Sequence, residues 1–155
     1  MQADEAEAER LLHAECDEAA RVLGVASLRE VQPDADLGVL PEVLARRVRH
    51  VVSENARVEA AVAAIEHGDV AALGEIVNAS HASLRDDYAV SVPAIDAIVQ
   101  AAQRDAAVYG ARIVGGGFGG SVLVLARKGT ACGAAERVVA HVDGPATVVV
   151  PRAIS

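Results

Sequence analysis

The feature that most constrains this chain is a run of five glycines around one phenylalanine, Gly115-Gly116-Gly117-Phe118-Gly119-Gly120. Glycine costs roughly 0.5–1 kcal/mol relative to alanine in regular structure and readily adopts positive φ, so such a run is unexpected where only packing is required. The mostly apolar runs 112–114 and 121–126 on either side predict two flanking strands. We therefore expect an exposed loop whose peptide N–H groups could face an anion.

The glycine loop fits neither of two common nucleotide-binding loops. Gly115, Gly117 and Gly120 fit the spacing G-x-G-x-x-G, but a dinucleotide site requires a helix at the third glycine, and residues 122–125 predict a strand. A Walker A loop is excluded because no Gly-Lys-Ser or Gly-Lys-Thr follows. A tight hairpin turn remains as the structural alternative, although two glycines would suffice for it. The composition favours a functional loop.

The charge and cysteine content narrow the class of protein. The 155 residues carry a net charge of −8, which disfavours nucleic acid as a partner because counterion release needs clustered Lys and Arg. One basic cluster, Arg46-Arg47-Arg49-His50, lies in a helical pattern among acidic residues and is interpreted as a solvated helix face. Cys16 and Cys132 lack metal-ligand spacing, and no signal peptide or membrane-length apolar run is present. We expect a cytoplasmic protein without a metal site or a membrane partner.

The remaining chain predicts helices first and strands last. Helices are expected over 3–24, from Pro41 to Glu66, from Val70 to about Ala79 with Asp69 as N-cap, from Pro93 to Tyr109-Gly110, and from Ala131 to Val142 with Thr130 as cap. Residues 41–79 form a long α-hairpin in this interpretation. Strands are expected over 111–114, 121–126 and 146–150. The predicted class is α+β, a single domain over 1–155 with helices packed on a small, mostly antiparallel sheet.

Several stretches together resemble the carboxyl-terminal domain of galactokinases, within the GHMP family of small-molecule kinases. They are residues 73–81 (LGEIVNASH), Ser83-Leu84-Arg85-Asp86-Asp87-Tyr88, Val90-Ser91, Tyr109-Gly110-Ala111-Arg112 and the glycine loop. The match is collinear from about Cys16 to Val150. The serine-histidine stretch narrows the resemblance from the wider family to galactokinases.

The resemblance implies transfer of the γ-phosphoryl group of ATP to the anomeric hydroxyl of galactose, in a cleft between two domains. It places ATP, Mg²⁺ and the catalytic residues mainly on an amino-terminal domain that this sequence lacks, so no catalytic residue is assigned here. It places the glycine loop at the phosphate and substrate end of the cleft, with the Phe118 ring buried as an anchor. The chain alone is expected to be inactive and to need a complementary catalytic half.

A second group of residues is diagnostic of the family without an assigned role: Ser80, His81, Ser83, Arg85, Asp86 and Tyr88. Asp86 or Asp87 could act as a general base, but the pattern favours a helix cap or a solvated turn.

The sequence also departs from the family at its amino-terminal end. Where galactokinases carry an arginine pair and a sugar-contacting tyrosine, this chain has Leu12, His13 and, near the tyrosine position, Glu9. The resemblance also implies a strand upstream of Met1, and its absence would leave an open sheet edge available for pairing with another chain.

These departures leave two functions open. One is the carboxyl-terminal part of a galactokinase from a split, truncated or frameshifted gene. The other is a non-catalytic binding or regulatory module, or a degenerate remnant, that retains the fold. An unrelated ligand-binding regulatory domain would not account for the serine-histidine stretch.

Overall fold

The computed structural model describes residues 2–142 and 146–151. Over these residues the chain forms α1 (Gln2–Leu23), the 3-10 helix η1 (Leu28–Glu30), α2 (Glu42–Glu66), α3 (Val70–Asp86), α4 (Pro93–Arg104), β1 (Val108–Val114), β2 (Ser121–Ala126) and α5 (Ala131–Val139). The two strands pair antiparallel, with Ile113 opposite Val122, in a two-stranded sheet. The predicted α+β class is confirmed, with helices packed on a small antiparallel sheet.

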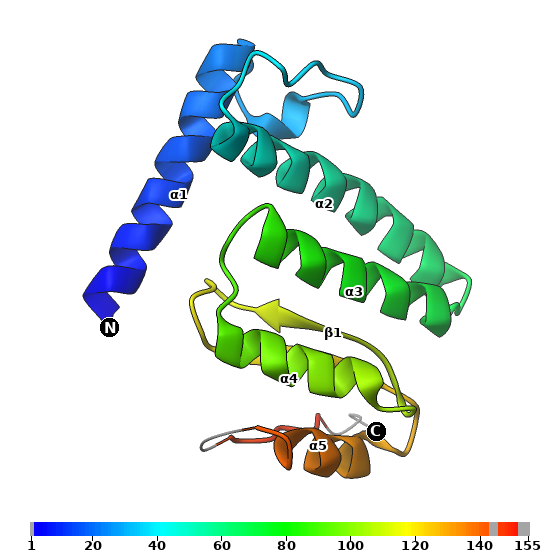
Figure 1. The fold of residues 1–155 in the computed structure, drawn as a ribbon. Coiled ribbons are helices and arrows are strands. Elements are labelled where there is room, and N and C mark those ends of the chain that lie inside the picture. The colour runs from blue at the N-terminus through cyan, green and yellow to red at the C-terminus, as the bar shows by residue number, and fades with distance from the viewer. Residues whose placement is uncertain (1, 143–145, 152–155) are drawn as a thin grey trace.

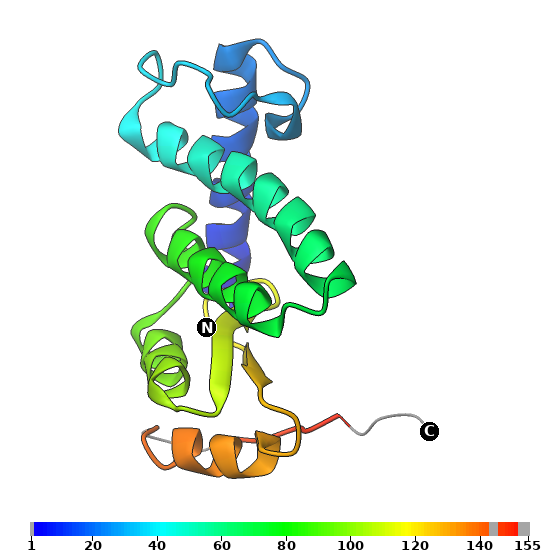
Figure 2. The same ribbon diagram turned by 90° about the vertical axis from the view of Figure 1, so that its right-hand side faces the viewer.

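The elements are stacked from the amino-terminal helices down to α5. α2 and α3 form the predicted hairpin, α3 lies alongside β1, and α4 packs against the same strand (Figures 1 and 2). One core cluster joins α1 to α2 and η1, through residues such as Ala19, Leu28 and Val48. A second lies around the sheet and includes Val99 and Ile113. The glycine loop between β1 and β2 extends from this second cluster.

Glycines and one aspartate account for several helix ends that the sequence predicts. α1 ends at Leu23, and Gly24 follows it with φ +70° and a backbone hydrogen bond back to Arg21. Asp69 caps α3 as expected, because its Oδ1 accepts the N–H of Ala72 at 2.9 Å. Pro41 immediately precedes α2, where its missing N–H removes no intrahelical bond.

Three predicted boundaries are wrong. α3 continues to Asp86 instead of ending near Ala79, because the polar residues that suggested a break bond to neighbouring elements from within the helix. α4 ends at Arg104, where the Oδ1 of Asp105 accepts the N–H of Ala107 and turns the chain into β1. Tyr109 and Gly110, expected to close that helix, lie in the strand.

The last part of the chain also differs from expectation. Thr130 makes no side-chain cap, and its hydroxyl donates instead to the carbonyl of Arg127 at 2.8 Å. α5 ends at Val139 rather than Val142. The described residues 146–150 form no strand and pair with neither strand of the sheet, and Val149 is 81 % exposed.

The basic cluster of α2 is only partly the solvated face that was expected. Arg49 is exposed, but Arg47 and His50 are each only 7 % exposed. The guanidinium of Arg47 pairs with Glu15 of α1 at 2.7 Å and donates to the carbonyl of Asp87 at 2.6 Å. Arg47 therefore joins α1 and the end of α3 to α2, which the sequence interpretation missed.

Candidate functional site

The glycine loop has a backbone that non-glycine residues would adopt only with strain. Gly115, Gly117, Gly119 and Gly120 have φ between +89° and +141°. Gly115 and Gly116 are exposed, and a Cβ built on either would meet nothing within 4 Å. The prediction of an exposed loop between two strands is confirmed, and β2 rather than a helix follows Gly120, as the exclusion of a dinucleotide site required.

The loop is attached to the segment that joins α3 to α4. Phe118 donates its backbone N–H to the carbonyl of Val90 at 2.7 Å, so this amide is not available to an anion. Its ring is half-buried against the core cluster around the sheet. A Cβ on Gly117 would lie 2.6 Å from the Cβ of Val90, so the loop backbone approaches this segment closely. The loop is thus held at its middle while its first glycines remain open.

Two non-glycine residues with positive φ meet at this junction. Ala89 has φ +59° and Phe118 has φ +57°. Such conformations cost an L-residue roughly 1–2 kcal/mol and cluster at functional sites. The strain lies where the loop is bonded to Val90, so the backbone of the loop is fixed at this junction.

One turn of α3 explains part of the family-diagnostic stretch. Asn78 donates through Nδ2 to the carbonyl of Tyr109 at 3.3 Å and accepts the N–H of Ala111 through Oδ1 at 3.0 Å. His81 accepts the N–H of Ile113 through Nδ1 at 3.4 Å. Side chains of α3 therefore bond to the β1 edge that faces away from β2. The sequence interpretation missed Asn78, whose three-residue spacing from His81 on a continued helix could have indicated it.

Ser80 belongs to a charged cluster between the hairpin and β1. Its hydroxyl donates to Glu54 of α2 at 2.8 Å and accepts from Arg112 of β1 at 2.7 Å. Glu54 also pairs with Arg57, and hydrogen bonds from Arg57 and Ser80 lower the pKa of its carboxyl group against the opposing effect of burial. No spacing in the sequence links Glu54, Ser80 and Arg112, because they come from three separate elements.

His81 is almost fully enclosed, with 3 % of its surface exposed. Since its Nδ1 accepts a hydrogen bond, the neutral ring carries its proton on Nε2, which lies 3.3 Å from Oδ1 of Asp96 but outside hydrogen-bonding geometry. Asp96 also accepts from the hydroxyl of Ser91 at 2.6 Å. Burial lowers the pKa of His81, while Asp96 opposes that shift. The ring is therefore neutral near pH 7.

The carboxyl-terminal part of the stretch faces α1 and α2 instead. Ser83 donates to Oδ2 of Asp87 at 3.1 Å and lies 3.0 Å from Nδ1 of His50, so the histidine is the donor in that pair. The ring of His50 stacks on Tyr88 with centroids 4.2 Å apart. Burial lowers the pKa of His50 to about 4 and raises the pKa of Tyr88 to about 12.

Arg85 and Asp86 lie outside this packed arrangement. They pair with each other at 2.7 Å on the exposed surface, and the Arg85 hydrogen bond lowers the pKa of the Asp86 carboxyl group. Asp87 is the C-cap of α3. A lowered pKa weakens the Asp86 carboxylate as a proton acceptor, and Asp87 lies at the end of α3 with Ser83 bonded to its carboxylate, so the cap and turn interpretation is favoured over a general base.

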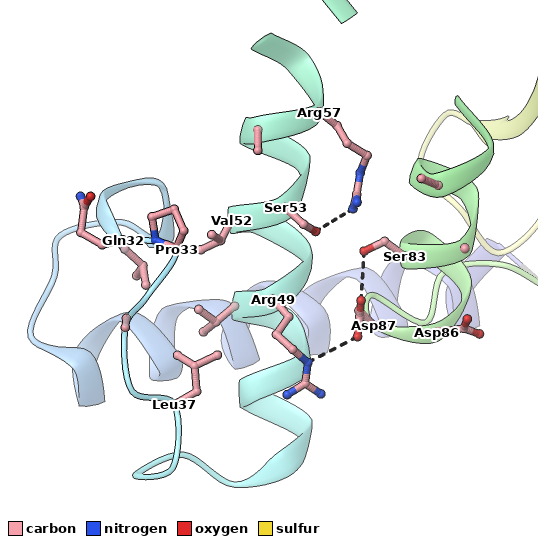
Figure 3. A pocket seen from close by; sticks show the side chains of 16 residues that line it. Gln32, Pro33, Leu37, Arg49, Val52, Ser53, Arg57, Ser83, Asp86 and Asp87 are labelled. Carbon is pink, nitrogen blue, oxygen red and sulfur yellow. Dashed lines mark hydrogen bonds and ion pairs between the residues drawn. The ribbon is translucent and has the colours of Figure 1, made fainter. Parts of the chain in front are cut away.

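A cavity of about 630 Å³ lies between α2, α3 and the loop that precedes α2 (Figure 3). Its polar side chains bond to one another: Arg57 to Ser53 at 2.6 Å, Ser83 to Asp87, and Arg49 to Asp87 at 3.7 Å. No residue of the glycine loop lines it. The cavity is therefore separate from the predicted phosphate and substrate end of the site.

Among residues 2–142 and 146–151, no three His, Cys, Asp or Glu side chains are grouped so that they could hold a metal ion. None of the helices described is long and apolar enough to span a membrane.

The departures from the family pattern lie on α1. Leu12 is 7 % exposed and belongs to the same core cluster as Val90 and Ile113. Glu9 and His13 are exposed. Leu12 is therefore a packing residue, and its apolar side chain offers no hydrogen bond to a sugar.

Comparison with known proteins agrees with this geometry. The family model for GHMP kinases C terminal matches residues 61–143, more than half of the chain. The chain is 49 % identical over 122 residues to a galactokinase of Roseiflexus sp., covering 74 % of this chain and 31 % of that protein. It is 43 % identical over 143 residues to the galactokinase of Homo sapiens, covering 90 % and 36 %.

A solved structure extends the likeness to the fold. The structure of Lactococcus lactis galactokinase complexed with galactose superposes with a TM-score of 0.80 at 35 % identity, covering 84 % of this chain and 36 % of that one. The chain thus spans about a third of the length of the relatives that it matches.

Proposed function

The chain belongs to the family of GHMP kinase C-terminal domains, and we propose that it forms the glycine-loop side of a galactokinase-type active site. Together with a catalytic half, that site transfers the γ-phosphoryl group of ATP to galactose. The observation that carries the proposal is the identity of 43–50 % to galactokinases over most of this chain.

The glycine loop supplies the chemical argument. Phosphoryl transfer depends mainly on positioning and on stabilising the charge of the transferred group. Gly115 and Gly116 present exposed backbone beside a loop centre that is held at Val90, so amide dipoles can be preorganised there. The resemblance assigns ATP and Mg²⁺ mainly to the catalytic half.

A chimera tests this proposal. The carboxyl-terminal third of the Roseiflexus galactokinase would be replaced by this chain, and ATP-dependent formation of galactose 1-phosphate would be measured. We expect turnover by the chimera and none by the chain alone. A folded chimera without turnover would refute the proposal, and so would robust activity of the chain by itself.

The alternative is a non-catalytic module that retains the fold. The observation that favours it is Leu12, which is packed in the core where galactokinases carry an arginine of the pair, with Glu9 exposed near the position of the sugar-contacting tyrosine. A Glu9→Tyr substitution in an inactive chimera distinguishes loss of one sugar contact from loss of the whole site, because recovery of turnover would identify the contact.

A further inference from the structure

The edge of β1 that faces away from β2 is occupied by side chains of α3. In an antiparallel strand alternate residues direct their backbone polar groups to opposite edges. Tyr109, Ala111 and Ile113 direct theirs toward α3, where Asn78 and His81 take the place of a neighbouring strand. Gly74 and Gly110 allow the close approach, because a Cβ on either would collide with backbone of the other element. The helix therefore sets the position of this strand directly.

The contacts of His81 lie on both sides of the glycine loop. Ile113, bonded to His81, lies two residues before Gly115. On the other side, Asp96 lies against His81 and accepts from Ser91, which is adjacent to the carbonyl that holds Phe118. His81 thus contacts both the strand that enters the loop and the helix whose first turn adjoins the loop's anchor.

We propose that Asn78 and His81 are positioning residues that hold β1 and, through it, the glycine loop in the geometry needed for phosphoryl transfer. The proposal rests on the proposed function and gives a role to the serine-histidine stretch. Neither residue touches substrate in this proposal. A shift of about 1 Å in a catalytic loop can lower turnover as much as 10²-fold, so a lost edge contact is sufficient for a measurable effect.

The role requires a neutral His81. When Nδ1 gains a proton it becomes a donor and faces the N–H of Ile113, so the contact is lost. The charged groups around the ring are Asp96 of α4, Arg85 of α3 and Arg112 of β1. Asp96 favours the protonated ring, whereas burial and the two arginines disfavour it. Turnover should therefore fall on acidification by a step that a variant without the imidazole lacks.

Two buried histidines provide a matched pair of variants. His81→Leu removes the acceptor for Ile113, and His50→Leu removes a histidine of similar burial that contacts Ser83 and Tyr88 but not β1. His81→Asn is the conservative variant, since its Oδ1 occupies the place of Nδ1. All three would be placed in the active chimera and assayed below their melting temperatures.

We expect His81→Leu to lower kcat by about tenfold or more, with a smaller change in KM for galactose, and His81→Asn to recover most of that loss. His50→Leu should leave kcat within about twofold. Equal losses from the two leucine variants, or no recovery by His81→Asn, would overturn the proposal. The proposal would also be overturned if kcat of His81→Asn fell on acidification in the same way as kcat of the chimera with His81.

Amide exchange on the chain by itself separates this inference from the proposed function. In His81→Leu we expect the amides of Ile113 and Phe118 to exchange at least about tenfold faster, while those of α1 are unchanged. Unchanged exchange at Ile113 would refute the positioning role even if the chimera were active. An inactive wild-type chimera would refute the proposed function and leave this measurement decisive for the contact.

Discussion

Gly117 and Gly116 are adjacent in the loop but differ in what they tolerate. Gly117 has φ +89°, and its Cβ would lie 2.6 Å from the Cβ of Val90, whereas Gly116 has open space and no left-handed φ. We expect Gly117→Ala to lower the free energy of unfolding by about 2 kcal/mol, since strain and overpacking add. Gly116→Ala should change it by less than about 0.5 kcal/mol. Urea denaturation of both variants measures the difference.

A larger side chain at Gly117 distinguishes a functional loop from a simple turn. If the loop is only a turn, a chimera that carries Gly117→Val will retain full turnover once it is folded. We expect turnover to be lost instead, because Val90 must move to admit the side chain and the Phe118 hydrogen bond is adjacent. Equal stabilities of Gly117→Ala and Gly116→Ala would contradict the close contact itself.

At the residue scale, the sequence predicts the unusual backbone of the glycine loop but not the segment around Val90 to which the loop is bonded. A run of five glycines in six residues predicts a backbone with positive φ, and the structure confirms this prediction. Ala89 has an equally unusual φ, but alanine carries no signature for it. The burial of Arg47 and His50 also has no local signature, because it depends on partners that are distant in sequence: Glu15 for the guanidinium of Arg47 and Tyr88 for the ring of His50.

The contact between α3 and β1 depends on a glycine that helix propensity would disfavour. Gly74 lies inside α3, where alanine is normally preferred by about 1 kcal/mol. Its Cβ would collide with the carbonyl oxygen of Tyr109. We expect Gly74→Ala to destabilise the protein by about 2–3 kcal/mol, as overpacking against backbone does. Thermal and urea unfolding measure this loss.

Gly133 in α5 is the matched control. It also lies inside a helix, but its Cβ would meet only the flexible end of Arg137, at 3.3 Å from Nη1. Gly133→Ala should therefore stabilise the protein by about 0.5–1 kcal/mol. Stabilisation by both substitutions would show that α3 does not approach β1 as closely as described.

At the element scale, periodicity predicts the helices that have a simple apolar face and fails where polar residues are buried. α1 and α2 agree with the prediction because glycine and proline mark their ends. α3 was predicted too short because Ser80, His81 and Ser83 look like loop residues until their partners on other elements are known. Residues 146–150 were predicted as a strand from β-propensity, but they pair with neither β1 nor β2, because propensity alone does not determine which strands pair.

The stability of the whole molecule should decrease on acidification because of His50. Its pKa is about 4 in the folded protein against 6.5 for an unperturbed histidine. A depressed histidine pKa means that the unfolded chain binds the proton first, so stability is lost as pH falls from about 6.5 to about 4. The loss from this group is at most about 3–4 kcal/mol, at 1.36 kcal/mol for each unit.

Urea unfolding at pH 7 and pH 5 measures this dependence. The wild-type chain should lose stability between the two values, and His50→Gln should lose distinctly less. His81 is also buried with a lowered pKa, so the variant keeps part of the dependence. An identical decrease in the two proteins would show that His50 titrates normally.

At the scale of the whole molecule, the family could be identified from the sequence, whereas the contacts between the hairpin and the sheet could not be predicted from it. Collinear motifs from residue 73 onward carry the identification, and the comparisons confirm it. The contacts that join the hairpin to the sheet involve Asn78, Glu54 and Arg112, which are separated by up to 58 residues. Such pairings depend on topology, so local sequence patterns do not indicate them.

Because one edge of β1 is occupied, a further strand can join this sheet on only one side. Side chains of α3 already bond to the carbonyl of Tyr109 and to the N–H groups of Ala111 and Ile113, so a strand arriving on that side would have to displace a helix. β2 has no such cover among the described residues, and Leu123 is 50 % exposed on it. Any strand that joins this sheet, whether from the same chain or from another, would therefore add beside β2, and extension is one-sided.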